Sequence, residues 1–280
     1  MNKLMYAGYT RLFKSKALYI CLAVLLYTNF FSVLGDMIVN GIPENKDSAQ
    51  AMLMSGFMVM TVLIPVFVCS FIGSEHSFGT IRNKMIIGCK RSLVYISCLL
   101  LSLMGVTIMY ALIWGLTGLL CAAGTLDISD VRAEPMLIML ICSYLAAAVI
   151  TAADTALALC IQSKSVSSVA ALLLSFVMMI AAVVTTQRLS EPEYTDPRSL
   201  VTEDSADIIP DSSGTGLVKN PLYLDGSARK RYQTVYDICP VTNMLNTGKD
   251  FAGKNVYIPA AEIVLLLAGG ASIFGKRDLK

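Results

Sequence analysis

Long uncharged apolar runs constrain this chain more than any other feature of its sequence. A helix needs about 20 apolar residues to cross the hydrocarbon core of a bilayer. Runs of this kind lie at residues 17–35, 51–73, 93–123, 136–161, 166–186 and 258–274, the last being shorter than the others. Only 15% of the residues are charged, against about 25% in soluble domains. The sequence therefore predicts an all-α integral membrane protein with six transmembrane helices.

Basic residues are distributed unevenly over the segments between these runs. With the N-terminus inside, the two short external loops hold only Lys46 and Arg132. Short cytoplasmic loops carry an excess of Lys and Arg, so we predict a multi-pass protein of the cell membrane with both termini in the cytoplasm. The basic residues on the cytoplasmic side are then Lys3, Arg11, Lys14, Lys16, Arg82, Lys84, Lys90, Arg91, Lys164, Lys276, Arg277 and Lys280.

Two segments depart from a simple bundle and divide the chain into parts. Residues 1–16 gather apolar side chains near one helical face, which predicts an N-terminal interfacial helix, with a plain basic tail as the alternative. Residues 188–257, about 70 in all, are acidic at first and rich in turn residues, and we interpret them as an extracytoplasmic insertion whose first half is either folded or disordered. The predicted parts are 1–187 with the interfacial helix and transmembrane helices 1–5, 188–257 as the insertion, and 258–280 with helix 6 and a basic tail. The apolar face of the N-terminal segment comprises Leu4, Met5, Tyr9, Leu12 and Phe13.

The third apolar run is longer than one perpendicular crossing requires. It is uncharged from residue 93 to residue 126. A span of this length must tilt, protrude from the bilayer, or break near Gly115 or Gly118.

The sequence offers no set of residues typical of catalysis, cofactor binding or metal binding. The eight cysteines form no C-x-x-C pair and His76 is the single histidine, so the cysteines are interpreted as packing residues. Residues 248–254 have the spacing of a phosphate-binding loop, but Asn255 stands where that loop needs Ser or Thr. The net charge of +2 gives no indication of nucleic-acid binding. We predict a protein that is not itself an enzyme.

The segment at residues 74–92, between the second and third runs, has an amphipathic pattern. Phe78, Ile81 and Met85 share one helical face, and Arg82 and Lys84 point away from it. A loop helix of this kind docks either on a soluble partner or on lipid headgroups. The pattern alone favours neither.

The order of residues in this segment resembles a known family. The motif Glu75-x-x-Phe78-Gly79-Thr80-Ile81-Arg82-Asn83-Lys84, followed by Gly88-x-x-Arg91-x-x-x-Tyr95, is similar to the first cytoplasmic loop of ATP-binding-cassette type-2 (ABC-2) permeases of Gram-positive bacteria. A second stretch resembles the external segment before the last span of the same family: Asn220-Pro221-x-Tyr223-x-x-Gly226-x-x-Arg229-Lys230-x-Tyr232, then Tyr236-Asp237-x-x-Pro240. The chain departs from the family at Val241-Thr242-Asn243, where a Gly-Gln pair is common.

The resemblance implies a permease subunit, an exporter by family analogy, that works with a separate ATP-binding-cassette ATPase subunit. One such chain is half of a translocation unit and would pair with a second copy or a homologous permease in the lipid bilayer. The loop would be the coupling helix, which sits in a groove of the ATPase. A stand-alone polytopic protein, either an ion-coupled transporter or a membrane sensor, is the alternative. The predicted contacts with the ATPase are Glu75, Phe78, Gly79, Thr80, Ile81, Arg82, Asn83 and Lys84.

Asp154 is an acidic residue inside the fourth apolar run. Ionisable residues within membrane spans are functional candidates by default. The neighbouring alanines form a small-residue surface that permits close helix contact. Asp154 is therefore either a packed, hydrogen-bonded aspartate or an intramembrane polar site on a substrate or gating path.

Overall fold

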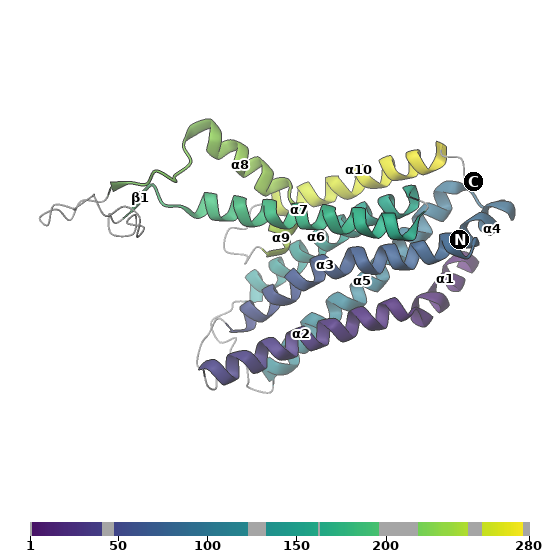
Figure 1. Ribbon diagram of the computed structural model, residues 1–280, viewed down its shortest axis with the longest axis horizontal. Coiled ribbons are helices and arrows are strands. Elements are labelled where there is room, and N and C mark those ends of the chain that lie inside the picture. The colour runs from purple at the N-terminus through teal and green to yellow at the C-terminus, as the bar shows by residue number, and fades with distance from the viewer. Residues whose placement is uncertain are drawn as a thin grey trace, which may run out of the picture.

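A computed structural model describes residues 2–40, 48–122, 133–161, 163–195, 218–245 and 254–276. Its long helices run roughly side by side along the longest dimension of the molecule (Figure 1). The predicted alternatives for the first half of the insertion fall mostly on residues 196–217, outside the described residues. The elements are α1 (Asn2–Lys14), α2 (Lys16–Asn40), α3 (Ser48–Ser77), α4 (Thr80–Ile86), α5 (Arg91–Ala122), α6 (Ala133–Cys160), α7 (Lys164–Ser190), β1 (Tyr194–Thr195), β2 (Val218–Lys219), α8 (Gly226–Ile238), α9 (Pro240–Leu245) and α10 (Lys254–Lys276).

The described helices confirm a multi-pass helical membrane protein. Five of them are long and apolar enough to cross a bilayer: Met52–Ser77, Arg91–Ala122, Leu137–Cys160, Lys164–Ser190 and Lys254–Gly275. A sixth candidate is the pair Met5–Lys14 and Lys16–Ser32, which is bent by 52°. The six predicted spans agree with the upper count. The regular elements of the described part are all helices except β1 and β2, which pair antiparallel with Tyr194 opposite Lys219.

Helix α3 lies at the centre of the bundle and packs against α2, α5, α6 and α7. Its large apolar residues Phe57, Met60, Ile64 and Phe67 are all fully buried. Close packing extends to α5, where Gly105 lies against the Phe67 ring and a Cβ atom would overlap it. Contacts on so many sides fix the path of α3 down to its last turn, where Glu75 lies.

The predicted N-terminal helix is present as α1, and the bend at Ser15 separates it from α2. Gly8 and Leu12 face the bundle, because Gly8 lies against Leu101 of α5 and Leu12 is fully buried. Tyr9 and Phe13, predicted on the same apolar face, are instead 45% and 37% exposed. Helix α1 is thus attached to the bundle through one edge and leaves aromatic side chains outside.

The third apolar run forms helix α5, which continues unbroken through Gly115 and Gly118. Its 32 residues correspond to about 48 Å at 1.5 Å per residue. A helix of this length exceeds the hydrocarbon thickness, so tilting or protrusion remain as its ways to fit a bilayer. Helices α7 and α10 also extend beyond the predicted boundaries, α7 to Ser190 and α10 back to Lys254.

The second motif stretch builds the joint between α7 and α8. Asn220 Nδ2 donates to Glu191 Oε2 at 2.9 Å, and its Oδ1 accepts the backbone N–H of Leu222 at 2.9 Å. Arg229 stacks over the Tyr223 ring with 5.0 Å to the ring centroid. These motif residues therefore support the chain's own fold by hydrogen bonding and a cation–π contact.

Helix α9 turns back into the bundle at the end that carries α8 (Figure 1). It packs against α3, α6 and α7, and its residues from Pro240 to Met244 are buried. Thr61 of α3 donates to the Met244 sulfur at 3.7 Å, and the Cys239 thiol donates to the Met178 carbonyl of α7 at 3.4 Å. The Val241-Thr242-Asn243 departure from the family pattern thus lies in a buried packing contact.

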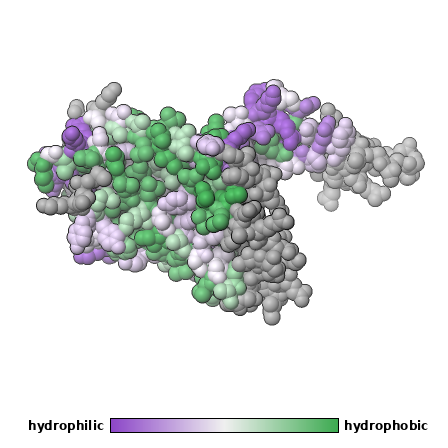
Figure 2. All heavy atoms as spheres, turned by 180° about the vertical axis from the view of Figure 1, so that it is seen from behind, coloured by the Kyte–Doolittle hydropathy of each residue, from purple (hydrophilic) through white to green (hydrophobic). Residues whose placement is uncertain are grey.

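The surface shows where this bundle meets an apolar solvent. Figure 2 shows hydrophobic residues across the body of the bundle and hydrophilic residues over α8. On α7, Leu173, Val177 and Ile180 are each 60% or more exposed, as are Val264 and Leu265 of α10. Apolar side chains exposed along whole helices are what a lipid-facing surface requires.

Candidate functional site at α1, α3 and α4

Two glycines in the left-handed conformation frame α4, the short helix between α3 and α5. Gly79 has φ 64° and follows the end of α3. Its N–H donates a hydrogen bond to the His76 carbonyl at 3.0 Å, and its carbonyl accepts one from the Asn83 N–H at 2.9 Å. Gly88 has φ 90° and follows the end of α4, and its N–H donates a hydrogen bond to the Met85 carbonyl at 3.0 Å. Residues with a Cβ avoid this conformation. Both turns therefore depend on the glycines that the loop motif carries.

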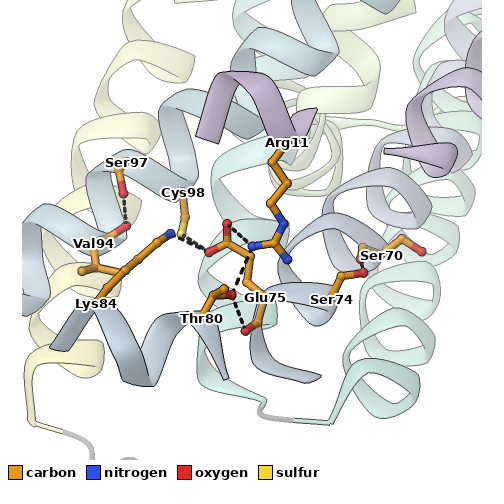
Figure 3. A network of polar contacts seen from close by, with 9 residues as sticks. All are labelled: Arg11, Ser70, Ser74, Glu75, Thr80, Lys84, Val94, Ser97 and Cys98. Atoms are coloured by element: carbon orange, nitrogen blue, oxygen red, sulfur yellow. Dashed lines mark hydrogen bonds and ion pairs between the residues drawn. The ribbon is translucent and has the colours of Figure 1, made fainter. Parts of the chain in front are cut away.

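Glu75 is the centre of a buried ionic cluster beneath α4 (Figure 3). Its side chain is 1% exposed, its Oε1 lies 3.2 Å from Arg11 Nη1, and its Oε2 lies 2.9 Å from Lys84 Nζ. The Cys98 thiol donates to Oε2 at 3.7 Å. A buried carboxylate is stable only when it is paired and hydrogen-bonded. Glu75 of α3 thereby binds α1, α4 and α5 together, and we call these four residues the Glu75 cluster.

Thr80 closes the same arrangement through the first residue of α4. Its Oγ1 donates to the Glu75 backbone carbonyl at 2.8 Å and accepts from Arg11 Nη1 at 3.1 Å. Arg11 therefore contacts both the side chain of Glu75 and the start of α4. The geometry couples the orientation of α4 to the position of α1.

The outer face of α4 and its flanks carries exposed apolar and basic side chains. Phe78 is 76% exposed, Ile86 is 73% exposed and Ile87 is 81% exposed. Arg82 and Asn83 are exposed as well. Arg82 and Ile86 lie four residues apart on α4 and therefore share one of its sides, and Phe78 is exposed just before the turn at Gly79. We call Phe78, Arg82, Asn83, Ile86 and Ile87 the α4 face.

The structure separates the eight residues predicted to contact a partner into two groups. Glu75 and Ile81 are buried at 1% and 2% exposure, so their side chains belong to the interior of this chain, while Thr80 and Lys84 bond to Glu75 and Gly79 makes the turn. Phe78, Arg82 and Asn83 point outward and are available for a contact. The predicted apolar pair Phe78 and Ile81 is thus split between outside and inside, because the left-handed turn at Gly79 breaks a continuous helical face.

Sequence reasoning missed four contributors to this region. Ile86 and Ile87 extend the exposed face. The sequence signal that could have indicated them is their position as two adjacent apolar residues just before Gly88 in a basic loop. Arg11 and Cys98 join the Glu75 cluster from 64 residues before Glu75 and 23 residues after it in the sequence, and no local pattern reveals such pairings.

The last residues of the loop motif hold α10 in place. Arg91 Nη1 donates to the Gly275 carbonyl at 3.0 Å, and the Tyr95 hydroxyl donates to the Leu266 carbonyl at 3.2 Å. Gly270 lies against the Tyr95 ring, where a Cβ atom would overlap the hydroxyl. Arg91 caps the C-terminal carbonyls of α10, as basic side chains commonly do at helix ends. The motif from Glu75 to Tyr95 thus connects α4 to α1, α3 and α5, and it connects α5 to α10.

Asp154 lies in α6, is 1% exposed, and leaves its Oδ2 without a hydrogen-bond partner among the described residues. Ala152 and Ala158 around it are buried, so the predicted small-residue packing is present. The predicted hydrogen bonding of the carboxylate is not found in the described part of the chain. Its role on a gating or substrate path stays a prediction.

The Glu75 carboxylate pairs with one cation at each oxygen and so joins α1 and α4 to the end of α3. The α4 face offers apolar anchors for a pocket and, at Arg82, a guanidinium that forks onto a carboxylate. Comparison with known proteins finds no matching family model and no matching curated protein.

Proposed function

We propose that this multi-pass membrane protein is the membrane-spanning permease subunit of an ABC-2 type exporter, and that its α4 face docks on a separate ATP-hydrolysing subunit. The loop motif from Glu75 to Tyr95 supports the family, and the exposure of Phe78 and Arg82 beside it supports the contact. A second copy of the chain or a homologous permease would complete the translocation unit.

The single observation that carries this proposal is the attachment of an exposed helix to a buried ionic cluster. Phe78 is 76% exposed, yet three residues before it Glu75 is 1% exposed and paired with two cations. A surface that only lay on lipid headgroups would need no such anchor. A surface that receives a force from a partner needs a rigid connection to the helices that must move.

The contacts of α4 define where such a force would go. Lys84 and Thr80 connect α4 to the end of α3, and Arg11 connects it to α1. Arg91, just beyond α4, connects the start of α5 to the end of α10. Closure of an ATPase dimer on ATP binding would move α4, and these bonds would pass the movement to α1, α3, α5 and α10.

The partner surface follows from the α4 face. Phe78, Ile86 and Ile87 call for an apolar groove, and Arg82 calls for an acidic residue at its rim. Interfaces draw most of their energy from a few buried aromatic and arginine anchors. We therefore expect Phe78 and Arg82 to dominate the contact.

The test is co-purification of this chain with an ATP-binding-cassette ATPase subunit from the cells that produce it. Truncating two such anchors costs about 2 kcal/mol or more, which is roughly a thirtyfold loss of affinity. Phe78→Ala with Arg82→Ala should insert into the membrane normally, lose its ATPase partner in mild detergent, and lower the ATPase activity of the purified complex in parallel.

A matched control lies on α1. Tyr6 is 76% exposed, as Phe78 is, and Lys14 is exposed on the same helix. Tyr6→Ala with Lys14→Ala removes the same kinds of side chain and should leave co-purification unchanged. Retention of the partner by the Phe78 and Arg82 variant, or absence of any ATPase from the wild-type preparation, would contradict the proposal and favour a stand-alone membrane protein.

A further inference from the structure

A cavity of about 470 Å³ opens where α1 bends into α2 and faces the last turns of α3 and the start of α7. Its volume lies within the range of about 300–1,000 Å³ that ligand pockets occupy. The lining residues that matter for its chemistry are Arg11, Lys14, Lys16, Ile20, Phe71 and Lys164. We call this space the bend cavity.

Positive charge converges on the bend cavity from three helices. Arg11 and Lys14 come from α1, Lys16 from α2 and Lys164 from α7, and none of the described residues that line the cavity is acidic. Within the described residues, Lys14, Lys16 and Lys164 have no ion-pair partner. This concentration of unneutralised charge is a site for an anion.

Arg11 adds a donor that the Glu75 cluster leaves unused. Its Nη1 binds Glu75 and Thr80, whereas its buried Nη2 has no hydrogen-bond partner in the described structure. Figure 3 shows this second nitrogen turned away from Glu75, on the side of Ser74, which also lines the cavity. A buried guanidinium nitrogen without an acceptor is costly, and an anionic oxygen in the cavity would satisfy it.

Lys164 reaches the cavity because α3 carries a glycine opposite it. A Cβ atom at Gly73 would lie 2.7 Å from Lys164 Cγ and 2.9 Å from its Cβ. Any larger residue at Gly73 would push the start of α7 away. The close approach of the two helices places the fourth basic residue beside the other three.

The remaining wall of the bend cavity is apolar and continues onto the outside of the bundle. Ala17, Val66 and Phe71 line it, and Ile20 of α2 is 62% exposed. A free inorganic anion would make no favourable contact with such an apolar wall. A molecule with an anionic head and an apolar tail matches both halves of the lining.

We propose that the bend cavity binds an anionic phospholipid, with the headgroup phosphate among Arg11, Lys16 and Lys164 and the acyl chains along Ile20. The bend between an interfacial helix and a span lies at headgroup depth, where anionic lipids attract Lys and Arg. A bound lipid would bridge α1, α3 and α7 and hold Arg11 toward the Glu75 cluster. Phe78 of the α4 face also lines the cavity, but lipid binding itself needs no ATPase partner.

The test measures lipid binding to the purified full-length protein in an uncharged detergent by native mass spectrometry. Phosphatidylglycerol should bind and phosphatidylcholine should bind much more weakly. Lys16→Gln with Lys164→Gln removes two charges from the cavity and should weaken phosphatidylglycerol binding roughly thirtyfold. The matched control, Arg82→Gln with Lys90→Gln, removes two exposed charges outside the cavity and should change binding less than threefold.

Three results would overturn the proposal. Equal losses in the two double variants would mean general attraction to a basic surface. Equal binding of both lipids by the wild-type protein would mean that the apolar wall alone holds them. A thermal stabilisation by inorganic phosphate equal to that by phosphatidylglycerol, and lost with Lys16 and Lys164, would assign the cavity to a free anion.

Discussion

Replacing Glu75 by Gln removes the negative charge that Arg11 and Lys84 share. The amide has nearly the same shape, so the change isolates charge from packing. Leaving a buried ion without its partner costs about 3–5 kcal/mol, but the Arg11 and Lys84 side chains keep 28% and 19% of their exposure. Water solvates part of both charges, so we expect a loss of about 2 kcal/mol in the free energy of unfolding.

The loss of stability on removing each partner of Glu75 should follow the distance and burial of that partner. Lys84 lies closer, at 2.9 Å and 19% exposure, than Arg11, at 3.2 Å and 28% exposure, so Lys84→Met should destabilise more than Arg11→Met. In the Glu75→Gln background, Lys84→Met should cost at least about 1 kcal/mol less than in the wild type, because the residues interact directly. Met at Glu75, Arg11 and Lys84 together should recover much of the loss, as apolar replacements of buried ion sets often do.

The unfolding temperature can be measured by labelling the cysteines of the chain. Unfolding in detergent exposes their thiols to a reactive fluorophore. A loss of about 2 kcal/mol corresponds to a fall of about 4–8 °C in the unfolding temperature. An unchanged unfolding temperature for Glu75→Gln, or additive effects of Glu75→Gln and Lys84→Met, would refute a stabilising role for the cluster. The thiols buried in the folded state are Cys21, Cys69, Cys98, Cys142 and Cys239.

Two further predictions concern orientation and Asp154. A cysteine at Ser227, exposed on α8, should react with an impermeant maleimide on intact cells, and a cysteine at Ser163 should not; the reverse pattern would invert the predicted topology. Native Cys239 should stay silent in that experiment because burial raises the pKa of its thiol and the thiolate is the reactive form. Asp154→Asn should leave both protein level and transport near normal, since the carboxylate has no ion-pair partner among the described residues; reduced transport at an unchanged protein level would instead place Asp154 on the transport path.

The apolar runs predicted the helices well because the hydrophobic requirement of a bilayer acts residue by residue. The separate N-terminal helix, the short loop helix and the long third span all appear near their predicted positions. The turns at Gly79 and Gly88 are local features too, since a left-handed backbone at one residue depends on that residue having no Cβ.

The roles of the loop residues could not be assigned in the same way. Glu75 and Ile81 belonged to the predicted contact surface by the loop motif, and they lie inside the bundle instead. Whether these side chains point inward or outward depends on which helices pack around the last turn of α3, and a local motif does not indicate those helices. Phe78 and Arg82 are exposed, because nothing else in the described chain packs over them.

The sequence by itself determined that this protein crosses a membrane several times and where its helices lie, because apolar length and glycine turns act on each segment alone. Tertiary structure decided what the polar residues do. Arg11 meets Glu75, Arg91 meets Gly275 and Tyr95 meets Leu266 across long stretches of chain. Each of these bonds forms only once the helices have packed, since buried polar groups then bond to whichever partner the neighbouring helix brings within reach.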